Sequence, residues 1–215
     1  MNKRDYKQFS CGSIVHVYNR GNNRENIFCD EQDYRAFLFR LGLVLGFEVK
    51  ELSKHPLTSV PLSRIRITSV KKEAFKLYAF CLMGNHFHFL IEQCSDIPVS
   101  KLISKICTSY AKYLNLKYKR VGHVFQDKFK SVLIESQPQL MWTSAYIHNN
   151  PVKDKFVERP ENYQWSSYAD YSSARNIPIL SKEMIQSVFK SDFEKETARL
   201  SKTVFDISLE TDERS

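Results

Sequence analysis

The 215-residue sequence predicts an α+β fold of ferredoxin-like type, an antiparallel sheet with helices on one face. Strand-like and helix-like segments follow in the order β-α-β-β-α-β-α, with a long insertion after the first helix. The two central strand-like segments are separated by three residues, which is a hairpin connection. Each helix-like segment repeats its nonpolar residues at intervals of three or four, so it has one side to bury against the sheet.

The first third of the chain supplies a strand, a helix and the insertion. Residues 13–18 are rich in β-branched residues and lead into a turn-forming run of Asn and Gly. Asp30 is a suitable N-cap for a helix that continues to Leu45. Residues 50–76 hold seven Lys and Arg against two Glu. They are expected to form a long basic connection with one short strand near residues 65–67.

The middle of the chain supplies the hairpin and a second helix. Residues 77–82 and 86–92 are the predicted strands, and the Gly-Asn pair between them is suitable for a hairpin turn. A helix is then expected from Pro98 to about Leu116, because its nonpolar and tyrosine side chains recur on one side.

The last third supplies a strand within residues 123–134 and a helix over about residues 138–149, which Pro151 is expected to end. We therefore predict one domain over residues 1–175. The tail over residues 176–215 holds six Lys and Arg against eight Asp and Glu, and is predicted to be an extension of unknown role.

Composition narrows the partners and the compartment. The formal net charge of +8 and the pI near 9.2 favour a polyanionic partner such as nucleic acid. The five cysteines are scattered without CxxC spacing, so neither a zinc knuckle nor a disulfide framework is expected. No signal peptide and no membrane-spanning run is readable. We therefore expect a cytoplasmic, nucleoid-associated protein with no membrane partner.

Two histidines, His86 and His88, flank Phe87 inside a predicted strand. Residues two apart in a strand point to the same face, so both imidazoles should project together, away from Phe87. Neutral imidazole is the commonest protein ligand for a divalent cation. An isolated pair of this kind also occurs as two half-exposed histidines without a ligand, so the pattern needs support from elsewhere.

Tyr146 and Asn150, in the last predicted helix, provide that support. They are four residues apart and therefore lie on the same side of a helix, one turn from each other. A phenol is a candidate nucleophile, and an amide oxygen is a candidate third metal ligand. Asn150 is expected in a frayed last turn before Pro151, and His148 should point away from Tyr146. Tyr146 alone would be weak because the chain has 11 tyrosines, so the combination carries the prediction.

Positive charge is concentrated between these two groups. Residues 101–130 hold eight Lys and Arg against one Asp, with aromatic residues interleaved. Lys and Arg attract phosphates, and exposed aromatic rings stack on unpaired bases. The turn after the first strand adds two arginines and several amides. The alternatives are a solvated helix surface and an ordinary β-α loop. The candidate DNA-binding residues are Arg20, Asn22, Asn23, Arg24, Lys112, Lys117, Lys119, Arg120, Lys128 and Lys130.

Five segments, in order, resemble the HUH single-tyrosine transposases, and within them the REP-associated tyrosine transposases. The segments are HVYNRG at 16–21, LMGNHFHFLI at 82–91, GHVFQDKFKS at 122–131, YIHNNPVK at 146–153 and WSSY at 165–168. Any one of them is unspecific, whereas the five together are highly specific. The insertion is longer than in compact family members, and the acidic tail has no family counterpart.

The resemblance implies an HUH endonuclease fold that binds Mg²⁺ or Mn²⁺ and acts on single-stranded or hairpin DNA as a monomer or homodimer. By position, His86 and His88 match the metal-binding pair, Asn150 the residue that completes the metal site, and Tyr146 the catalytic nucleophile. The expected activity is metal-dependent cleavage and rejoining of single-stranded DNA through a 5′-phosphotyrosine intermediate, at REP-like hairpins.

Three other functions fit parts of the sequence and stay open at this point. The chain could be a domesticated single-stranded DNA-binding protein that no longer transposes. A ferredoxin-like RNA-binding module would also read single strands with aromatic side chains. A metal hydrolase using His86, His88 and His123 would activate water instead of Tyr146.

Overall fold

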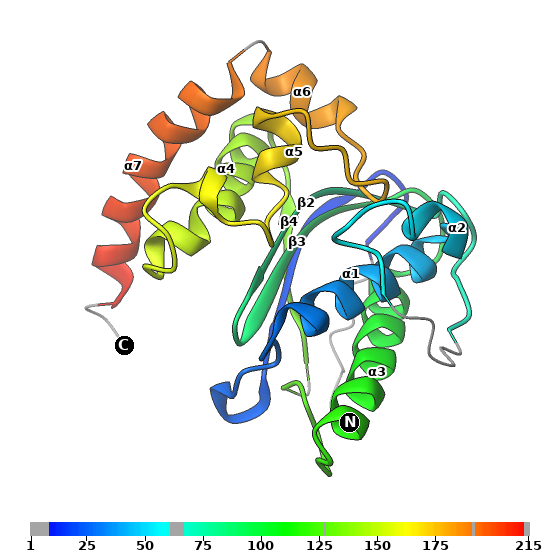
Figure 1. The fold of residues 1–215 in the computed structure, drawn as a ribbon. Helices are drawn as coiled ribbons and strands as arrows, with labels where there is room; N and C mark the ends of the chain where they lie inside the picture. Colours follow the sequence, from blue (N-terminus) through cyan, green and yellow to red (C-terminus); the bar gives the residue numbers. More distant parts are fainter. Residues whose placement is uncertain (1–8, 61–66, 127, 191, 213–215) are drawn as a thin grey trace, which may run out of the picture.

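The computed structural model describes residues 9–60, 67–126, 128–190 and 192–212, with side chains described as far as residue 202. The described residues form a four-stranded antiparallel sheet in the order β2-β3-β1-β4 (Figure 1). The strands are β1 (Ile14–Arg20), β2 (Phe75–Met83), β3 (His86–Gln93) and β4 (Lys130–Ile134). This strand order confirms the predicted α+β class with a ferredoxin-like sheet.

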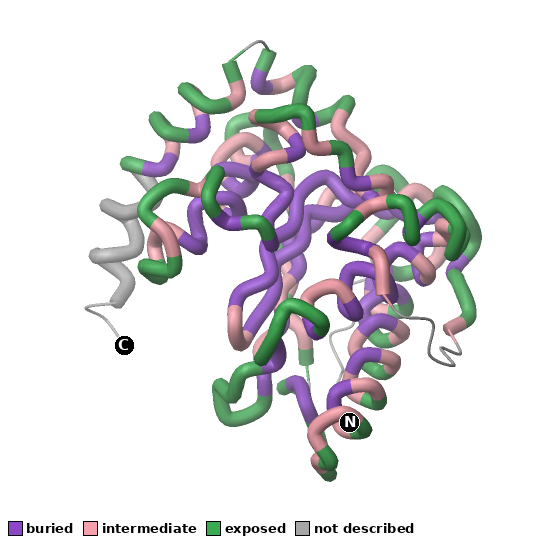
Figure 2. The backbone as a smooth tube through the Cα atoms, in the orientation of Figure 1, coloured by how far each residue is buried: buried purple, intermediate pink, exposed green. Residues whose placement is uncertain are grey.

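One face of the sheet is covered by α1 (Glu31–Leu45) and α3 (Val99–Lys117), as predicted (Figure 1). The Asp30 side chain caps α1 by accepting a hydrogen bond from the Asp33 N–H at 3.0 Å. Phe37 of α1 packs on Phe87 and Phe89, with ring centroids 5.2 and 6.0 Å apart. These rings belong to the core that Figure 2 shows as the buried centre of the molecule.

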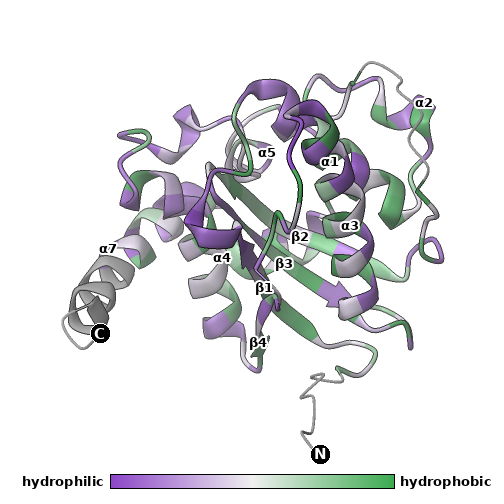
Figure 3. Ribbon diagram, turned by 90° about the horizontal axis from the view of Figure 1, so that it is seen from below, coloured by the Kyte–Doolittle hydropathy of each residue, from purple (hydrophilic) through white to green (hydrophobic). Residues whose placement is uncertain are grey.

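The opposite face of the sheet is covered by a second layer of helices, so the prediction that the helices lie on one face only was wrong. Its helices are α4 (Gln137–Lys153), α5 (Tyr168–Ser172), α6 (Glu183–Phe189) and α7 (Phe193–Asp212). A second layer is needed because residues 77–83 of β2 are nonpolar and buried on both faces of the sheet. Figure 3 shows the hydrophobic character of the strands between the layers.

The tail packs along α4, the helix that carries Tyr146. Phe193 at the start of α7 lies with its ring 5.5 Å from that of His148 and 4.9 Å from that of Tyr171. His148 is fully buried and shares a hydrogen bond of 2.7 Å with Ser167, so it points away from Tyr146 as predicted. The outer side of α4 is therefore held by the tail while its inner side faces the sheet.

The prediction that Pro151 ends the helix that carries Tyr146 was wrong, because α4 continues through it to Lys153. Proline lacks the N–H for one helical hydrogen bond and crowds the carbonyl one turn earlier, but the turn beyond Pro151 is closed by other bonds. The Asp154 N–H donates to the Asn150 carbonyl at 2.9 Å, and the Phe156 N–H donates to the Pro151 carbonyl at 2.8 Å. Asn150 is consequently helical rather than part of a frayed turn.

The remaining short elements lie in connections. Within the insertion, a four-residue helix forms first, and most of the strand expected near residues 65–67 falls outside the described residues. The strand expected within 123–134 is confined to β4, with one isolated bridge between Phe125 and Gly21. The short helices are α2 (Val49–Leu52), η1 (Asn22–Arg24) and η2 (Pro160–Asn162). In the described part of the chain, no helix is both long and nonpolar enough to span a membrane.

Candidate active site

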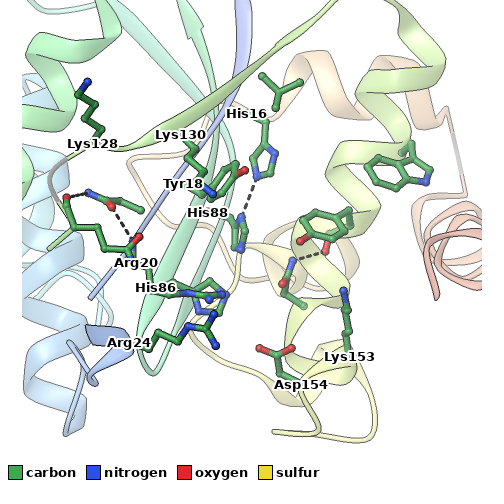
Figure 4. A pocket seen from close by; sticks show the side chains of 16 residues that line it. His16, Tyr18, Arg20, Arg24, His86, His88, Lys128, Lys130, Lys153 and Asp154 are labelled. Carbon is green, nitrogen blue, oxygen red and sulfur yellow. Dashed lines mark hydrogen bonds between the residues drawn. The ribbon is translucent and has the colours of Figure 1, made fainter. Parts of the chain in front are cut away.

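A cavity of about 610 Å³ opens between the sheet and α4 (Figure 4). Its walls come from β1, β3, β4 and α4, so it forms where α4 packs over the sheet. The four predicted site residues, His86, His88, Tyr146 and Asn150, all line it. Segments separated by some sixty residues of sequence are thus brought to one place, as the sequence predicted.

The histidines reach the cavity because of strand parity. In the antiparallel pairing of β1 with β3, Arg20 lies opposite His86 and Tyr18 lies opposite His88. Paired residues share a face, so these four side chains line the cavity while Phe87 points into the core. The His86 and His88 ring centroids are 5.0 Å apart with the rings nearly perpendicular.

A third histidine, which sequence reasoning missed, completes this wall. Nε2 of His16 lies 2.9 Å from Nδ1 of His88, and the two rings share a hydrogen bond. On the other side, Nδ1 of His86 lies 2.6 Å from the side-chain oxygen of Asn85. The available signal was parity again, because His16 stands two residues before Tyr18 on the same strand face.

Burial keeps these imidazoles neutral. Desolvation lowers the pKa of His16 to about 4, and desolvation with the charge of Arg20 lowers the pKa of His86 to about 4. Complete burial, reinforced by the neighbouring histidines, keeps the pKa of His88 well below its usual range. Neutral imidazoles offer a free nitrogen lone pair, which a metal ligand requires.

The amide of Asn150 supplies the site with a third donor beside the two histidines. Among the described residues no group of three or more His, Cys, Asp or Glu side chains is arranged to hold a metal. Asn150 is almost fully buried, and its side-chain N–H donates to the Tyr146 carbonyl at 2.8 Å. That bond uses the nitrogen and leaves the amide oxygen as an acceptor. Two neutral imidazoles and one amide oxygen fit a divalent cation that accepts nitrogen and oxygen ligands.

Tyr146 projects from α4 toward the histidines. Its ring centroid lies 5.7 Å from that of His88 and 5.9 Å from that of His16. The ring is also stacked on Trp142, one helical turn earlier, with centroids 5.5 Å apart and planes 8° from parallel. Burial raises the pKa of Tyr146, and a hydrogen bond from the Asn150 side chain acts in the opposite direction.

Positive charge surrounds this phenol. Of the predicted DNA-binding residues, four line the cavity, namely Arg20, Arg24, Lys128 and Lys130. Lys153 and Asp154 line it as well and were not predicted, because the helix was expected to end before them. Five basic residues against one acidic residue make the cavity attractive to a phosphate group.

Other predicted DNA-binding residues lie elsewhere and have structural partners. Lys117 forms ion pairs with Asp30 at 2.6 Å and with the fully buried Asp33 at 2.7 Å. Arg120 forms an ion pair with Glu25 at 2.5 Å. These acidic partners stand far away in sequence, so the local count of positive charge could not reveal them.

The last predicted candidates are exposed and outside the cavity. They are Lys112, Lys119, Asn22 and Asn23. The two asparagines shape the loop after β1: the Asn22 N–H donates to the Val124 carbonyl at 2.9 Å, and Asn23 adopts a positive φ of 51°. The loop starts at Gly21, where a Cβ would lie only 2.2 Å from the Glu25 carbonyl oxygen. Its tight path brings Arg24 to the cavity.

Comparisons with known proteins identify a family and a similar fold. Residues 12–150 match the family described as "Transposase IS200 like". A solved structure described as "Structure of the REP associates tyrosine transposase bound to a REP hairpin" is similar, with a TM-score of 0.55 and 16% sequence identity. The similarity covers 83% of this chain and 90% of that chain. At this identity it supports the fold. A search of curated proteins finds no match.

Proposed function

Since the protein belongs to the IS200-like transposase family, we propose that it cleaves and rejoins single-stranded DNA with Tyr146 as its covalent nucleophile. The observation that carries this proposal is the meeting of a phenol, a pair of neutral histidines and a ring of basic side chains in one cavity. Such a cavity can receive a phosphodiester, neutralise its charge and present an oxygen nucleophile to its phosphorus.

We further propose that His86, His88 and Asn150 would hold Mg²⁺ or Mn²⁺. A bound divalent cation would polarise the scissile phosphate and offset the charge that develops during attack. The hydrogen bond between His16 and His88 supports this assignment. A metal-binding histidine usually has its second ring nitrogen held by a hydrogen bond, which orients the ring and selects its tautomer.

Attack by Tyr146 would exchange one phosphate ester bond for another. The Tyr146 oxygen forms a bond to phosphorus, and the bond from phosphorus to the 3′-oxygen of the preceding nucleotide breaks. The phenol loses its proton and the departing 3′-oxygen gains one, so the products are a 5′-phosphotyrosine and a free 3′-OH. Attack of a 3′-OH on the phosphotyrosine reverses the steps and rejoins DNA without another energy source.

The preferred substrate is proposed to be a DNA hairpin with an unpaired flank. The strand must be unpaired to enter the cavity, and Arg20, Lys130 and Lys153 would contact its phosphates. The similar solved structure is described as bound to a REP hairpin, which supports the same substrate class here. Tyr146 and the histidines come from one chain, so we propose that a monomer contains a complete site.

A covalent-adduct assay tests the proposal. The protein would be incubated with Mn²⁺ and a labelled hairpin bearing a single-stranded flank, taken from DNA beside its own gene, and analysed on a denaturing gel. Tyr146→Phe should abolish the adduct and cleavage while binding to single-stranded DNA persists. Tyr18→Phe is the matched control, because it removes the other phenol of the cavity and should leave an adduct. An adduct from Tyr146→Phe would refute the nucleophile assignment.

The alternatives differ in what they need from the site. A hydrolase that used His123 as a third ligand is disfavoured, because His123 is exposed and does not line the cavity. A DNA-binding protein without activity would not require the phenol beside the histidines. An RNA-binding module would bind RNA tightly and give no tyrosyl adduct with DNA in the assay above.

A further inference from the structure

Trp142 stands beside the nucleophile in the wall of the cavity. It lies one helical turn before Tyr146 on α4, and its indole is stacked nearly parallel on the phenol ring. The residue is only partly buried and lines the cavity together with Tyr146. The indole therefore places a second aromatic ring in the cavity wall, beside the proposed nucleophile.

The indole nitrogen of Trp142 is buried and makes no hydrogen bond to the described residues. Packing and stacking on Tyr146 therefore hold the ring, and no polar contact fixes its orientation. Trp165 offers the contrast within the same chain. It is 6% exposed, stacks on Tyr34 with centroids 4.5 Å apart, and lies outside the cavity. Trp165 has the surroundings of a packing residue, whereas Trp142 does not.

The cavity wall is mostly polar and becomes nonpolar at Val132 and Trp142. Among the described lining residues, Val132 and Trp142 alone carry neither an ionisable group nor an amide. Val132 lies opposite His16 in the pairing of β1 with β4, and the Tyr146 ring lies against His16. Val132 is 44% exposed, so the described chain covers this nonpolar side chain only in part. Lys130, two residues before it on the same strand face, adds a positive charge at its edge.

We propose that Trp142 is the stacking surface for the unpaired nucleobase next to the phosphate that Tyr146 attacks. The inference rests on the proposed function and adds a base subsite to it. A nucleotide presents a flat nonpolar face and a phosphate, which matches a cavity whose wall holds both an indole and basic side chains. Every base has such a face, so the subsite fixes the position of the strand and reads little of its sequence.

Fluorescence tests the contact directly, because the chain has two tryptophans. In a Trp165→Phe background the emission comes from Trp142, and stacking of a base should quench it. The probe is an oligothymidylate, added in EDTA so that cleavage does not occur. In the reciprocal Trp142→Phe protein, the remaining Trp165 should keep its emission. Emission of Trp142 that is unchanged at saturating oligothymidylate would overturn the inference.

A thermodynamic cycle separates stacking from support of the fold, and it uses proteins with Trp165 intact. The affinities of the wild type and of Trp142→Ala are measured for oligothymidylate and for an abasic oligomer of equal length. Loss of base stacking should weaken oligothymidylate binding about 5- to 150-fold. The abasic oligomer should bind both proteins equally, because it has phosphates and no bases. Trp142→Phe should retain much of the affinity for oligothymidylate.

Each other outcome has a definite meaning. An equal loss on both oligomers would overturn the inference, since Trp142 would then only hold Tyr146 or α4 in place. An unchanged affinity of Trp142→Ala for oligothymidylate would overturn it as well. A failure of the wild type to bind either oligomer would remove the inference together with the proposed function. If Trp142→Ala formed the Tyr146 adduct as the wild type does at every DNA concentration, the base subsite would be refuted and the proposed function would stand.

Discussion

Removing the His16 side chain should weaken metal binding, although the proposed ligands are untouched. His16 is 8% exposed and its Nε2 lies 2.9 Å from Nδ1 of His88, which is 4% exposed. In His16→Ala that nitrogen of His88 loses its hydrogen-bond partner within the protein. The His88 ring also becomes free to rotate or to change its tautomer, so it presents the coordinating nitrogen less often.

The size of the effect follows from two independent figures. Leaving one buried polar group without its hydrogen bond costs about 1–3 kcal/mol. Loss of the hydrogen-bond partner of a metal-binding histidine typically reduces metal affinity about 10- to 100-fold, which equals about 1.4–2.8 kcal/mol. The two ranges overlap, so we expect the dissociation constant for Mn²⁺ to rise about 10- to 100-fold.

Calorimetric titration of Mn²⁺ into each variant measures this constant, and the Mn²⁺ concentration for half-maximal adduct formation provides a second reading. His16→Gln keeps a hydrogen-bonding group at the position and should recover part of the affinity. His123→Ala is the matched control, because it removes an exposed histidine outside the cavity. Wild-type Mn²⁺ affinity in a folded His16→Ala protein would refute the orienting role of His16.

Four further outcomes are expected. Lys117→Ala should lower the free energy of unfolding by about 1–3 kcal/mol, because it leaves the buried carboxylate of Asp33 without its ion pair, and single-stranded DNA affinity should stay unchanged. Urea titration and anisotropy check this, and weaker DNA binding at unchanged stability would contradict it. Lys128→Ala should reduce the slope of log affinity against log salt by about 0.7 for a single strand; an unaltered slope would exclude a phosphate contact. Phe193→Ala should lower the free energy of unfolding by about 2 kcal/mol. This is less than the ~3–5 kcal/mol for a fully buried phenylalanine, because Phe193 is only partly buried, and limited proteolysis should then release α7. EDTA should stop adduct formation while DNA binding continues, and an adduct formed in EDTA would exclude the metal.

The spacing rules predicted the part of the site that depends on local geometry. Strand parity put His86 and His88 on one face, and helical periodicity put Tyr146 and Asn150 on one side of α4. His16 was missed because its contact with His88 spans 72 residues of sequence. Strand parity gives the face on which His16 lies, but its contact with His88 follows only once β1 is paired with β3.

The distribution of charge along the sequence predicted the cavity-lining residues least well. Eight basic residues cluster in the sequence, yet Lys117 and Arg120 are engaged by acidic side chains of other segments. A count along the chain cannot separate a free cation from one that neutralises a distant carboxylate. The predicted family resemblance is confirmed by the match over residues 12–150, whereas the ion pairs could be found only from the folded arrangement.

The second helical layer had a readable signal. Residues 77–83 form a nearly continuous nonpolar run, which indicates a strand buried on both sides, and a sheet with a bare second face would expose half of it. Pro151 misled because proline is a strong helix breaker in isolation, while here the packing of α7 and the bonds beyond the proline hold the last turn.

Cavity-lining and core-forming side chains alternate along β1 and β3, and this has a genetic consequence. A one-residue insertion or deletion within β3 would exchange the faces, sending Phe87 to the cavity and His88 into the core. Such a change would destroy folding and chemistry together. A substitution at His88 or Tyr146 would instead silence the chemistry and spare the packing of the opposite face. Inactive descendants that survive as stable proteins should therefore carry substitutions at Tyr146 of α4 or at alternate positions of β1 and β3, with strand lengths unchanged.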